Sequence, residues 1–552
     1  MITLKIDGKE HFYDEGLKYE LIAGEFQDSY RDRIALVTMN GKIRELMKKA
    51  DRDGELGFIT TSGEAGHRTY CRTAIMILMK AVEDVEGKGT SEYVKVEFTN
   101  GPAYFCSFGD RETVTAETAE EIRERMHAII EADLPITKKA YPLEEGIELF
   151  RKLGMKDKVG LFRFRRSSMI NIYCLGDYYD YYYGYMMPST GYIDLFDVVP
   201  YENGVMLVLP EKSDHSVLPE FRPRKKLFET MKQASDWGIM MGIGTVGDLN
   251  EQICASRAEE MILVQEALQE RRIGEVAQEI RNRETVRAVL VAGPSSSGKT
   301  TFSKRLSVQL VTMGYKPIMI SLDDYYLDHS MTPLDEDGNP DYECLEALDI
   351  KLFGENMDSL LEGKETEVPI FNFQTGKREA EGRKLILEDN DILVIEGIHA
   401  LDTGLINKIP DEKLFRIFIS ALTSINIDEH NRIPTTDTRL IRRLVRDFRT
   451  RGASARRTIG MWDSVRRGEE KYIFPFQEEA DVFFNSSLVY ELSVLKPYAE
   501  PLLYSVPKGA PEYYEAKRLL KFFEYFLTLP ATGVPGDSLV REFIGQGVFG
   551  MG

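Results

Sequence analysis

The segment Gly293-Pro-Ser-Ser-Ser-Gly-Lys-Thr300 constrains the fold of this chain most, because it matches the phosphate-loop pattern G-x-x-x-x-G-K-[ST]. The apolar residues 289–292 before it predict a short buried strand, and residues 301–312 after it predict an amphipathic helix. A loop in this setting directs backbone N–H groups and the positive end of a helix at a polyphosphate. The sequence therefore predicts a nucleotide site, rather than a serine- and glycine-rich turn that binds nothing.

The same loop supplies the predicted ligands of the nucleotide. Lys299 is expected to neutralise phosphate charge, and the Thr300 hydroxyl is expected to bind Mg²⁺. The remaining predicted phosphate contacts come from Gly293, Ser295, Ser296, Ser297, Gly298 and Thr301.

Length and composition limit the class of protein. A chain of 552 residues is too long for one hydrophobic core, so several domains are expected. A formal charge of −20 argues against a general nucleic-acid binder, which needs a basic face. The start of the chain lacks a signal pattern and no uncharged apolar run could span a membrane, which predicts a cytoplasmic protein without membrane partners. The five scattered cysteines are expected to be reduced core thiols.

Three further apolar segments predict strands that alternate with helices: residues 317–322, 391–396 and 414–420. Such a pattern indicates a parallel sheet covered by helices on both faces. Ligands of these sheets bind at the carboxyl ends of the strands, which selects Asp323, Asp324 and Glu396 beside the phosphate loop. Asp323 is the candidate base, with a helix cap or turn as the alternative, and Glu396 is a candidate Mg²⁺ residue or a cap.

An arginine-rich segment follows in this acidic protein. Residues 439–467 contain ten arginines and only two acidic residues. Arg439, Arg442, Arg443 and Arg446 have the spacing of one helix face, and no acidic partner is expected near them in sequence. We predict that this face binds the transferring phosphate, with a solvated face or an RNA-binding patch as the alternatives.

These pieces together resemble the uridine kinase family, which includes phosphoribulokinase-like enzymes. The matching segments are residues 293–300, 321–326, 340–349, 368–373 with Arg378, 395–398, 439–447, and Arg451 with Gly452. The resemblance implies an ATP- and Mg²⁺-dependent kinase of a small-molecule hydroxyl acceptor, most simply the 5′-hydroxyl of a uridine- or cytidine-like nucleoside.

The resemblance also implies roles for individual residues. Asp323 would receive the proton of the 5′-hydroxyl, and Glu343 would hold the ribose hydroxyls. Arg443 would help to hold the sugar and, with Arg446 and Lys299, act in catalysis, while Arg446 and Arg451 would contact phosphates from a lid. The remaining acceptor-site positions are Phe371 and Arg378.

The chain departs from the family pattern in the base pocket. Phe371 stands in place of a family tyrosine and Gly376 in place of a histidine, so two groups that contact the pyrimidine are missing. Loss of these hydrogen bonds leaves the identity of the base open. A second lid arginine of the family is Ala453 here, and Arg456 or Arg457 could replace it.

The N-terminal part resembles two domains of threonyl-tRNA synthetase. Residues 1–60, with turns at Asp7-Gly8 and Asn40-Gly41, resemble the TGS domain, a small β-grasp-like fold. Residues 61–210 resemble the α+β editing-type domain. Four positions that carry three histidines and one cysteine in the editing domain are His67, Cys71, Tyr182 and Met186 here, so metal binding and hydrolysis are not expected. The tyrosine-rich residues 178–185 are expected to pack in a core, or else to line a cleft.

The predicted protein is thus a multidomain α/β kinase. Its expected domains are a TGS-like domain at 1–60, an editing-like domain at 61–210, a helical connector at 211–285, a phosphate-loop kinase domain at 286–510 and a helical tail at 511–552, whose glycine-rich end from Gly545 is expected to fray. Two other functions remain open: an RNA- or tRNA-binding regulator that uses the loop as a nucleotide switch, and a kinase of a sugar or sugar phosphate. The sequence also leaves self-association and coupling between the domains open.

Overall fold

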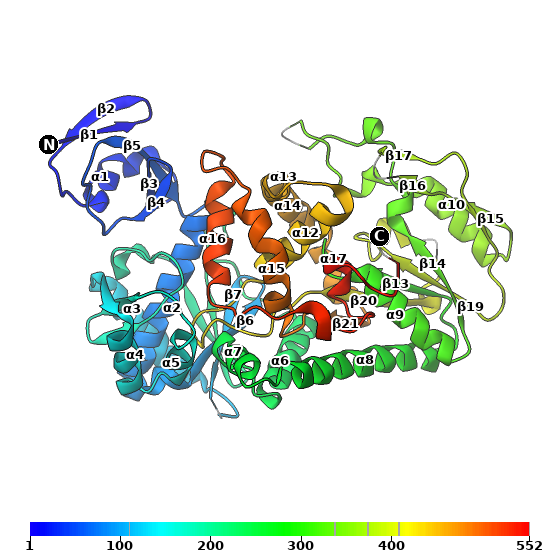
Figure 1. Ribbon diagram of the computed structural model, residues 1–552, viewed down its shortest axis with the longest axis horizontal. Helices are drawn as coiled ribbons and strands as arrows, with labels where there is room; N and C mark the ends of the chain where they lie inside the picture. The colour runs from blue at the N-terminus through cyan, green and yellow to red at the C-terminus, as the bar shows by residue number, and fades with distance from the viewer. Residues whose placement is uncertain (110, 336–337, 373–374, 407–408, 551–552) are drawn as a thin grey trace. The chain divides into compact units, whose positions relative to one another are not determined.

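The computed structural model describes residues 1–109, 111–335, 338–372, 375–406 and 409–550. The chain folds as two compact units (Figure 1). Unit 1 contains Met1–Arg224, Gly244–Asp248 and Ile425–Arg432, and unit 2 contains Lys225–Ile243, Leu249–Ser424 and Ile433–Gly552.

The first 60 residues of unit 1 form a mixed five-stranded sheet in the order β2-β1-β5-β3-β4. Asp7-Gly8 and Asn40-Gly41 form its hairpin turns, and all four residues adopt the positive φ that these residue types tolerate. The elements are β1 (Ile2–Ile6), β2 (Lys9–Tyr13), α1 (Tyr19–Phe26), β3 (Ile34–Met39), β4 (Lys42–Glu45) and β5 (Gly54–Thr60).

The rest of unit 1 contains two antiparallel sheets and their helices. One sheet has the order β11-β12-β7-β6 and the other β10-β9-β8. Their strands are β6 (Val94–Asn100), β7 (Ala103–Phe108), β8 (Ile136–Pro142), β9 (Met169–Leu175), β10 (Tyr178–Asp180), β11 (Asp197–Tyr201) and β12 (Gly204–Val208), with helices α2 (Glu64–Glu86), α3 (Ala116–Glu131), α4 (Leu143–Lys152) and α5 (Lys156–Phe162). Tyr178, Tyr181 and Tyr182 are buried, so the tyrosine-rich segment packs in this core and does not line an open cleft.

Unit 2 is built on a five-stranded sheet in the order β14-β19-β13-β20-β21, and every neighbouring pair is parallel. The strands are β13 (Ala288–Ala292), β14 (Lys316–Ser321), β19 (Asp391–Glu396), β20 (Leu414–Ser420) and β21 (Val482–Asn485). The predicted parallel α/β fold of this region is therefore confirmed.

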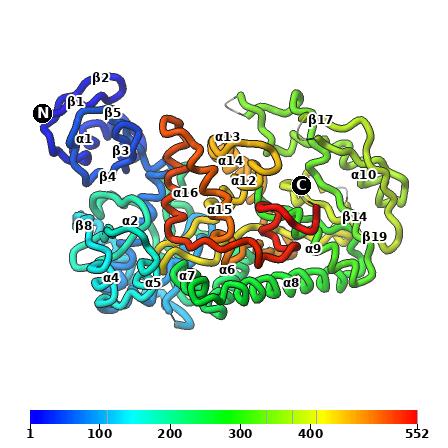
Figure 2. The backbone as a smooth tube through the Cα atoms, in the orientation of Figure 1, coloured from blue at the N-terminus to red at the C-terminus, as the bar shows by residue number. Residues whose placement is uncertain are grey.

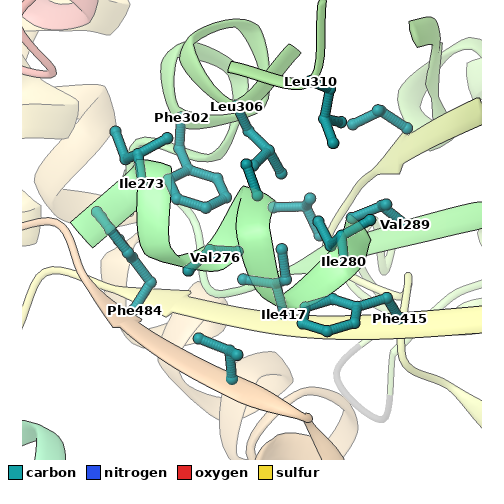
Figure 3. Packing of buried hydrophobic residues seen from close by; sticks show 14 of the residues in the cluster. Ile273, Val276, Ile280, Val289, Phe302, Leu306, Leu310, Phe415, Ile417 and Phe484 are labelled. Carbon is teal, nitrogen blue, oxygen red and sulfur yellow. The ribbon is translucent and has the colours of Figure 1, made fainter. Parts of the chain in front are cut away.

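Alternate residues of the strands point to opposite faces, and both sets are buried in the central strands β13 and β19. On one face, α8 (Ala258–Asn282) and α9 (Lys299–Thr312) pack against the strands (Figure 3). Figure 3 shows Ile273, Val276 and Ile280 of α8 facing Phe302 and Leu306 of α9 across this core. The opposite set, which includes Leu290, Leu393 and Ile395, is also buried, so neither face is open to solvent.

The other helices of unit 2 complete the framework of the site. They are α6 (Lys225–Met240), α7 (Val246–Cys254, which begins in unit 1), α10 (Ile350–Leu361), α11 (Thr403–Ile406), α12 (Thr435–Arg451), α13 (Ala455–Gly460), α14 (Trp462–Tyr472), α15 (Glu491–Tyr504), α16 (Tyr513–Phe523) and α17 (Arg541–Ile544). Short strands β15 (Thr366–Val368), β16 (Phe371–Asn372), β17 (Lys377–Arg378) and β18 (Arg383–Leu385) form two small hairpins. The backbone can be followed in Figure 2.

The predicted connector 211–285 is more than a link between domains. Its long helix α8 contributes Ile273, Val276 and Ile280 to the core of unit 2. The sequence predicted a charged amphipathic helix that bridges the domains, and the apolar face of α8 instead packs in this core. The connector is therefore in part a layer of the α/β fold.

A short segment of the predicted kinase region belongs to unit 1. Residues 425–432 lie between β20 and α12, and inside unit 1 Lys158 Nζ lies 3.5 Å from Asp428 Oδ1. His430 Nδ1 lies 2.7 Å from Asp180 Oδ2, and all four side chains are buried. The compact units thus interrupt the continuous stretch 286–510, because long-range ion pairs rather than sequence order hold this loop.

The positions of the cysteines and the length of the apolar helices bear on two predictions from the sequence. Cys71, Cys106 and Cys344 are buried, but Cys254 is exposed, so the cysteines are not all core thiols. Cys254 is the last residue of the amphipathic helix α7 and is exposed there. The spacing of the cysteines along the sequence did not indicate this exposure. Among the described residues, no helix combines the length and apolar character needed to cross a bilayer.

Candidate active site

The phosphate loop connects β13 to α9 at the carboxyl end of the central strand. Gly293 has a φ of 157°, and a Cβ there would lie 2.0 Å from the carbonyl oxygen of Ile419 on β20. Gly298 has a φ of 88° and is the N-cap of α9. Glycine is therefore required at both fixed positions, one for close packing against the next strand and one for the left-handed backbone.

Inside the loop, Lys299 folds back and donates to the carbonyl oxygens of Gly293 at 2.9 Å and Pro294 at 3.3 Å. Burial lowers the pKa of Lys299. The hydroxyl oxygens of Ser296 and Ser297 are buried without a hydrogen-bond partner among the described residues. A bound anion would give these donors a partner, which is consistent with the predicted phosphate site.

Two carboxylates meet the loop at the ends of neighbouring strands. Glu396 ends β19 and lies in register with Ser321 at the end of β14. Its Oε1 accepts hydrogen bonds from the hydroxyls of Thr300 at 3.3 Å and Ser321 at 3.1 Å. Asp323 follows directly in the turn after β14, where its N–H donates to Ser321 Oγ at 3.3 Å. The parallel sheet thus brings these residues together.

The electrostatics of Glu396 fit a cation site. Burial, followed by the negative charge of Asp323, raises the pKa of Glu396 to about 7. A cation beside these oxygens would favour the ionised form, since opposite charge lowers the pKa of a carboxyl group.

The donor set of Thr300 and Glu396 is the kind that Mg²⁺ takes, because this ion prefers oxygen and binds through one or two carboxylates, waters and phosphate oxygens. In the described part of the chain, no three His, Cys, Asp or Glu side chains form a metal-binding group. The residues therefore fit a Mg²⁺ ion shared with a nucleotide rather than a closed protein cage.

Glu343 lies near the phosphate loop with one oxygen unsatisfied. Its Oε2 is buried and has no hydrogen-bond partner among the described residues. Burial raises the pKa of Glu343 to about 7, against the positive charge of Arg443. A buried acceptor of this kind is costly unless a ligand supplies a donor. Glu343 is thus a candidate for holding hydroxyl groups.

An aromatic cluster includes Tyr342, the residue that precedes Glu343. The ring of His329 is 5.1 Å from that of Tyr342 and 5.6 Å from that of Phe371. Phe371 is in turn 5.9 Å from Tyr326. These four rings provide flat apolar surface, which suits a planar ligand. Phe373 of the predicted motif lies outside the described residues.

The imidazole of His329 occupies the space above Gly376. A Cβ on Gly376 would lie 2.3 Å from His329 Nδ1. The backbone N–H of His329 donates to the Gly376 carbonyl at 2.9 Å. Gly376 has a φ of 66°, which favours glycine. His329, from a loop 47 residues earlier in the chain, therefore fills the space that a side chain at position 376 would take.

Two arginines of α12, Arg439 and Arg442, are neutralised, contrary to the expectation from the sequence. Arg439 is paired with Glu469 of α14, and Arg442 donates to Glu491 of α15 at 2.7 Å. Both arginine side chains are buried, with exposed fractions of 1% and 0%. Their acidic partners lie 30 and 49 residues further along the chain, so sequence proximity could not reveal them.

Arg443, Arg446 and Arg451 surround a single carboxylate, Asp447. Arg443 Nε lies 3.2 Å, Arg446 Nη2 2.8 Å and Arg451 Nη1 3.8 Å from its oxygens. Arg443 also donates to the hydroxyl of Ser295 in the phosphate loop at 2.9 Å. Arg443 therefore contacts the phosphate loop directly, and binding of the transferring phosphate by this part of the helix stays a prediction.

The buried pair of Arg442 and Glu491 gives a prediction about stability. Arg442→Met should lower the free energy of unfolding by about 3–5 kcal/mol, because it leaves the Glu491 charge buried and unpaired. Urea unfolding followed by circular dichroism measures this. The double variant with Glu491→Gln should recover much of the loss, and a single variant as stable as the parent would contradict the prediction.

Arg378 holds the turn that follows Asp323. Its guanidinium donates to the backbone oxygens of Tyr325 at 2.8 Å and Tyr326 at 3.0 Å, and to Asp349 at 3.0 Å. These bonds use three of its five N–H donors. Its contact with an acceptor stays a prediction.

The second set of predicted positions lies in unit 1. His67 Nδ1 is 2.9 Å from Nε2 of His215, and Cys71 Sγ is 3.6 Å from His67 Nε2. Burial lowers the pKa of His67 to about 4 and raises that of Cys71 to about 11. Tyr182 and Met186 are buried core residues. The histidine and the thiol are thus neutral at pH 7.

Sequence reasoning did not find His329, Asp447, Glu469 or His215. His215 and His329 stand outside any motif, and only seven histidines occur in the chain, so a search for unassigned histidines would have singled them out. Asp447 was visible beside Arg446, but its role as a shared partner depends on side-chain direction. Glu469 gave no signal in the sequence.

Comparisons with known proteins show what this chain is similar to. The model of the phosphoribulokinase / uridine kinase family matches residues 288–492. A uridine kinase from Halalkalibacterium halodurans is 32% identical over 193 residues, which cover 35% of this chain and 82% of that protein. A threonine–tRNA ligase from Clostridium tetani is 31% identical over 197 residues, or 35% of this chain and 30% of the ligase. The solved structure of a D-glycerate 3-kinase from Cryptococcus neoformans var. grubii has a TM-score of 0.23 and 16% identity, over 48% of this chain and 89% of that one.

Proposed function

Because this chain belongs to the phosphoribulokinase / uridine kinase family, we propose that it is an ATP- and Mg²⁺-dependent kinase which phosphorylates the 5′-hydroxyl of a nucleoside. The observation that carries the proposal is the meeting of Lys299, Asp323 and Glu396 at the carboxyl ends of three adjacent parallel strands. Phosphoryl transfer to a hydroxyl requires a phosphate-loop lysine, a carboxylate that accepts the hydroxyl proton and a carboxylate that helps to bind Mg²⁺.

In this proposal each residue has one task. Asp323 accepts the proton of the acceptor hydroxyl as its oxygen bonds to the γ-phosphorus, and the bond from that phosphorus to the β–γ bridging oxygen breaks to release ADP. Thr300 and Glu396 hold the Mg²⁺, which neutralises phosphate charge when bound. Lys299 leaves the loop carbonyls for the phosphates, and Arg443, already on Ser295, adds positive charge.

A nucleoside is favoured over a plain sugar by two features of the acceptor region. Glu343 Oε2 is buried without a partner, which suits a ribose hydroxyl as donor. The rings of His329, Tyr342 and Phe371 offer stacking surface that a sugar phosphate would not need. A sugar kinase would rather present hydrogen-bonding side chains at that place.

The experiment that tests the function is an ADP-release assay on purified full-length protein with a panel of nucleosides, sugars and sugar phosphates. Stimulation by one or more nucleosides supports the proposal. Stimulation by a sugar or sugar phosphate alone would replace the acceptor class, and background release with every compound would reject kinase activity.

For residues 1–210 we propose domains like the TGS and editing domains of a threonyl-tRNA synthetase, without hydrolysis of their own. The neutral state of His67 and Cys71 supports the absence of hydrolysis. Such a part would sense or present a ligand, or mediate assembly. Salt-sensitive tRNA binding by the full-length protein would instead favour an RNA-linked regulator.

His329 gives a prediction about the acceptor. His329→Ala should raise KM for the preferred nucleoside roughly tenfold with a smaller change in kcat, because it removes a ring from the wall beside Phe371. Steady-state kinetics at saturating ATP measure both constants. The neighbouring Ser330→Ala is the control, and an unchanged nucleoside KM in the His329 variant would contradict the prediction.

A further inference from the structure

The part of the C-terminal tail that the structure describes, up to residue 550, packs against α9. Leu539 belongs to the core that α8 and α9 form on the sheet. The N–H of Val548 donates to the carbonyl of Gly536 at 2.9 Å, and Lys304 of α9 donates to the carbonyl of Phe549 at 3.0 Å. Figures 1 and 2 show this red segment ending near α9. The described residues 538–550, here called the C-terminal segment, are thus part of unit 2.

One acidic side chain of the C-terminal segment reaches the start of α9. Glu542 Oε2 accepts hydrogen bonds from the backbone N–H of Thr301 at 3.3 Å and from its hydroxyl at 3.0 Å. Both residues are buried, with exposed fractions of 9% and 2%. Thr301 directly follows the lysine and threonine of the loop, where N–H groups at the helix N-terminus are expected to hold a nucleotide phosphate. Glu542 therefore places an anion on a donor that ATP would use.

The arginine helix α12 holds the same segment from the other side. Arg449 donates to the carbonyl oxygens of Glu542 at 2.9 Å and Phe543 at 3.1 Å. The guanidinium of Arg442 lies 5.0 Å from the centre of the Phe543 ring. The backbone of Glu542 is thus hydrogen-bonded to α12, the helix that also carries Arg443 and Arg446. Movement of the C-terminal segment would therefore also affect these predicted phosphate ligands.

A second carboxylate occupies the other end of the loop. Glu469 Oε1 accepts a hydrogen bond from the N–H of Ser295 at 3.2 Å and is also bound by Arg439. Glu469 is part of the buried pair with Arg439, whereas among the described residues the side chain of Glu542 is hydrogen-bonded to Thr301 alone. Each carboxylate accepts two hydrogen bonds, but within the described residues Glu542 can leave the loop without breaking an ion pair with an arginine.

We propose that Glu542 competes with the phosphates of ATP for Thr301, so that the C-terminal segment is an autoinhibitory element that must release α9 before ATP binds. This inference rests on the proposed ATP-dependent function and adds a regulation of the same site. Leu539 anchors the segment in the core, so the expected motion is confined to α17 and the residues after it. The affinity for ATP is reduced by the fraction of molecules in which Glu542 occupies Thr301.

Nucleotide binding tests this directly, without dependence on the acceptor. A fluorescent ATP analogue is titrated with Mg²⁺ into the full-length protein, into Glu542→Ala and into Asp537→Ala, which removes a carboxylate five residues earlier. The Glu542 variant should bind on the order of ten times more tightly than the parent, and the Asp537 variant should bind like the parent. Equal or weaker binding by the Glu542 variant would overturn this inference alone. Absence of binding in all three proteins would overturn ATP binding itself and the inference with it.

A second measurement needs no variant and so does not depend on how a variant folds. Trypsin cleavage after Arg541 is followed by mass spectrometry of the released C-terminal peptide, with and without ATP. Arg541 donates to the carbonyl oxygens of Ala531 and Val534 in the closed arrangement. ATP should increase cleavage several-fold if it displaces the segment. Protection by ATP would show that the segment helps to hold the nucleotide, which overturns the inference.

Discussion

Asp323→Asn is expected to reduce kcat for the preferred acceptor by about 10²–10⁴-fold, because asparagine cannot take up the hydroxyl proton. The substitution keeps the size of the side chain, and the backbone N–H of residue 323 can still donate to Ser321 Oγ. KM for ATP should change little, since Asp323 is assigned to the acceptor and not to the loop. An ADP-release assay at saturating ATP and acceptor measures this.

The adjacent Asp324→Asn is the matched control. Asp324 Oδ1 accepts a hydrogen bond from the N–H of Phe371 at 3.2 Å, and Oδ2 lies 3.5 Å from Arg383. Asparagine can still accept the bond from Phe371, so kcat should stay within about tenfold of the parent. Similar losses in the two variants would mean that the region acts only as a folded turn. Full activity of the Asp323 variant would remove it from the base role.

Lys299→Ala is expected to lower kcat/KM for ATP by roughly 10²–10³-fold, the cost of removing one charged donor from a site of developing charge. Lys299 donates to Gly293 O and Pro294 O in this structure, and those carbonyls border the place where phosphates are expected. Partial burial of Lys299 lowers its pKa and would also strengthen its interaction with phosphate oxygens, because water screens charges less there.

Lys316→Ala serves as the control for loss of a lysine charge. Lys316 begins β14 at the opposite end of the sheet, is exposed, and lies 3.5 Å from Asp391. It should have no measurable effect on kcat/KM for ATP, since an exposed ion pair contributes little. If Lys299→Ala retained the parental kcat/KM, the loop would not be the site of transfer.

The fold of unit 2 could be predicted because its information is local. Short apolar strands, a glycine-rich loop and amphipathic helices each depend on neighbouring residues, and their alternation leads to a parallel sheet. The burial of α8 in the core was missed because a helix with many charges and an apolar stripe can face either a core or a partner. The departure of residues 425–432 into unit 1 was missed because it depends on side chains hundreds of residues apart.

The candidate site divides in the same way. Strand ends locate Asp323 and Glu396 beside the loop, because parallel strands place their carboxyl ends at one edge. The acceptor region could not be derived, since His329 reaches Gly376 only through the path of an irregular loop. The arginines of α12 were read as one free phosphate-binding face, but burial cannot be judged from helical spacing alone, and Arg439 and Arg442 proved to be paired.

The sequence by itself determined the phosphate loop from Gly293 to Thr300, because every fixed position of that loop is set by backbone conformation and covalent order. Only the tertiary structure decided what meets the loop from elsewhere in the chain: Glu469 at Ser295, Arg443 at Ser295 and Glu542 at Thr301. These contacts depend on close packing between helices that are distant in sequence. A buried charge is stable there because it has a partner in space, and that partner is not a neighbour in sequence. The loop can therefore be predicted from the sequence alone, whereas the packing of the segments around it determines how a ligand reaches it.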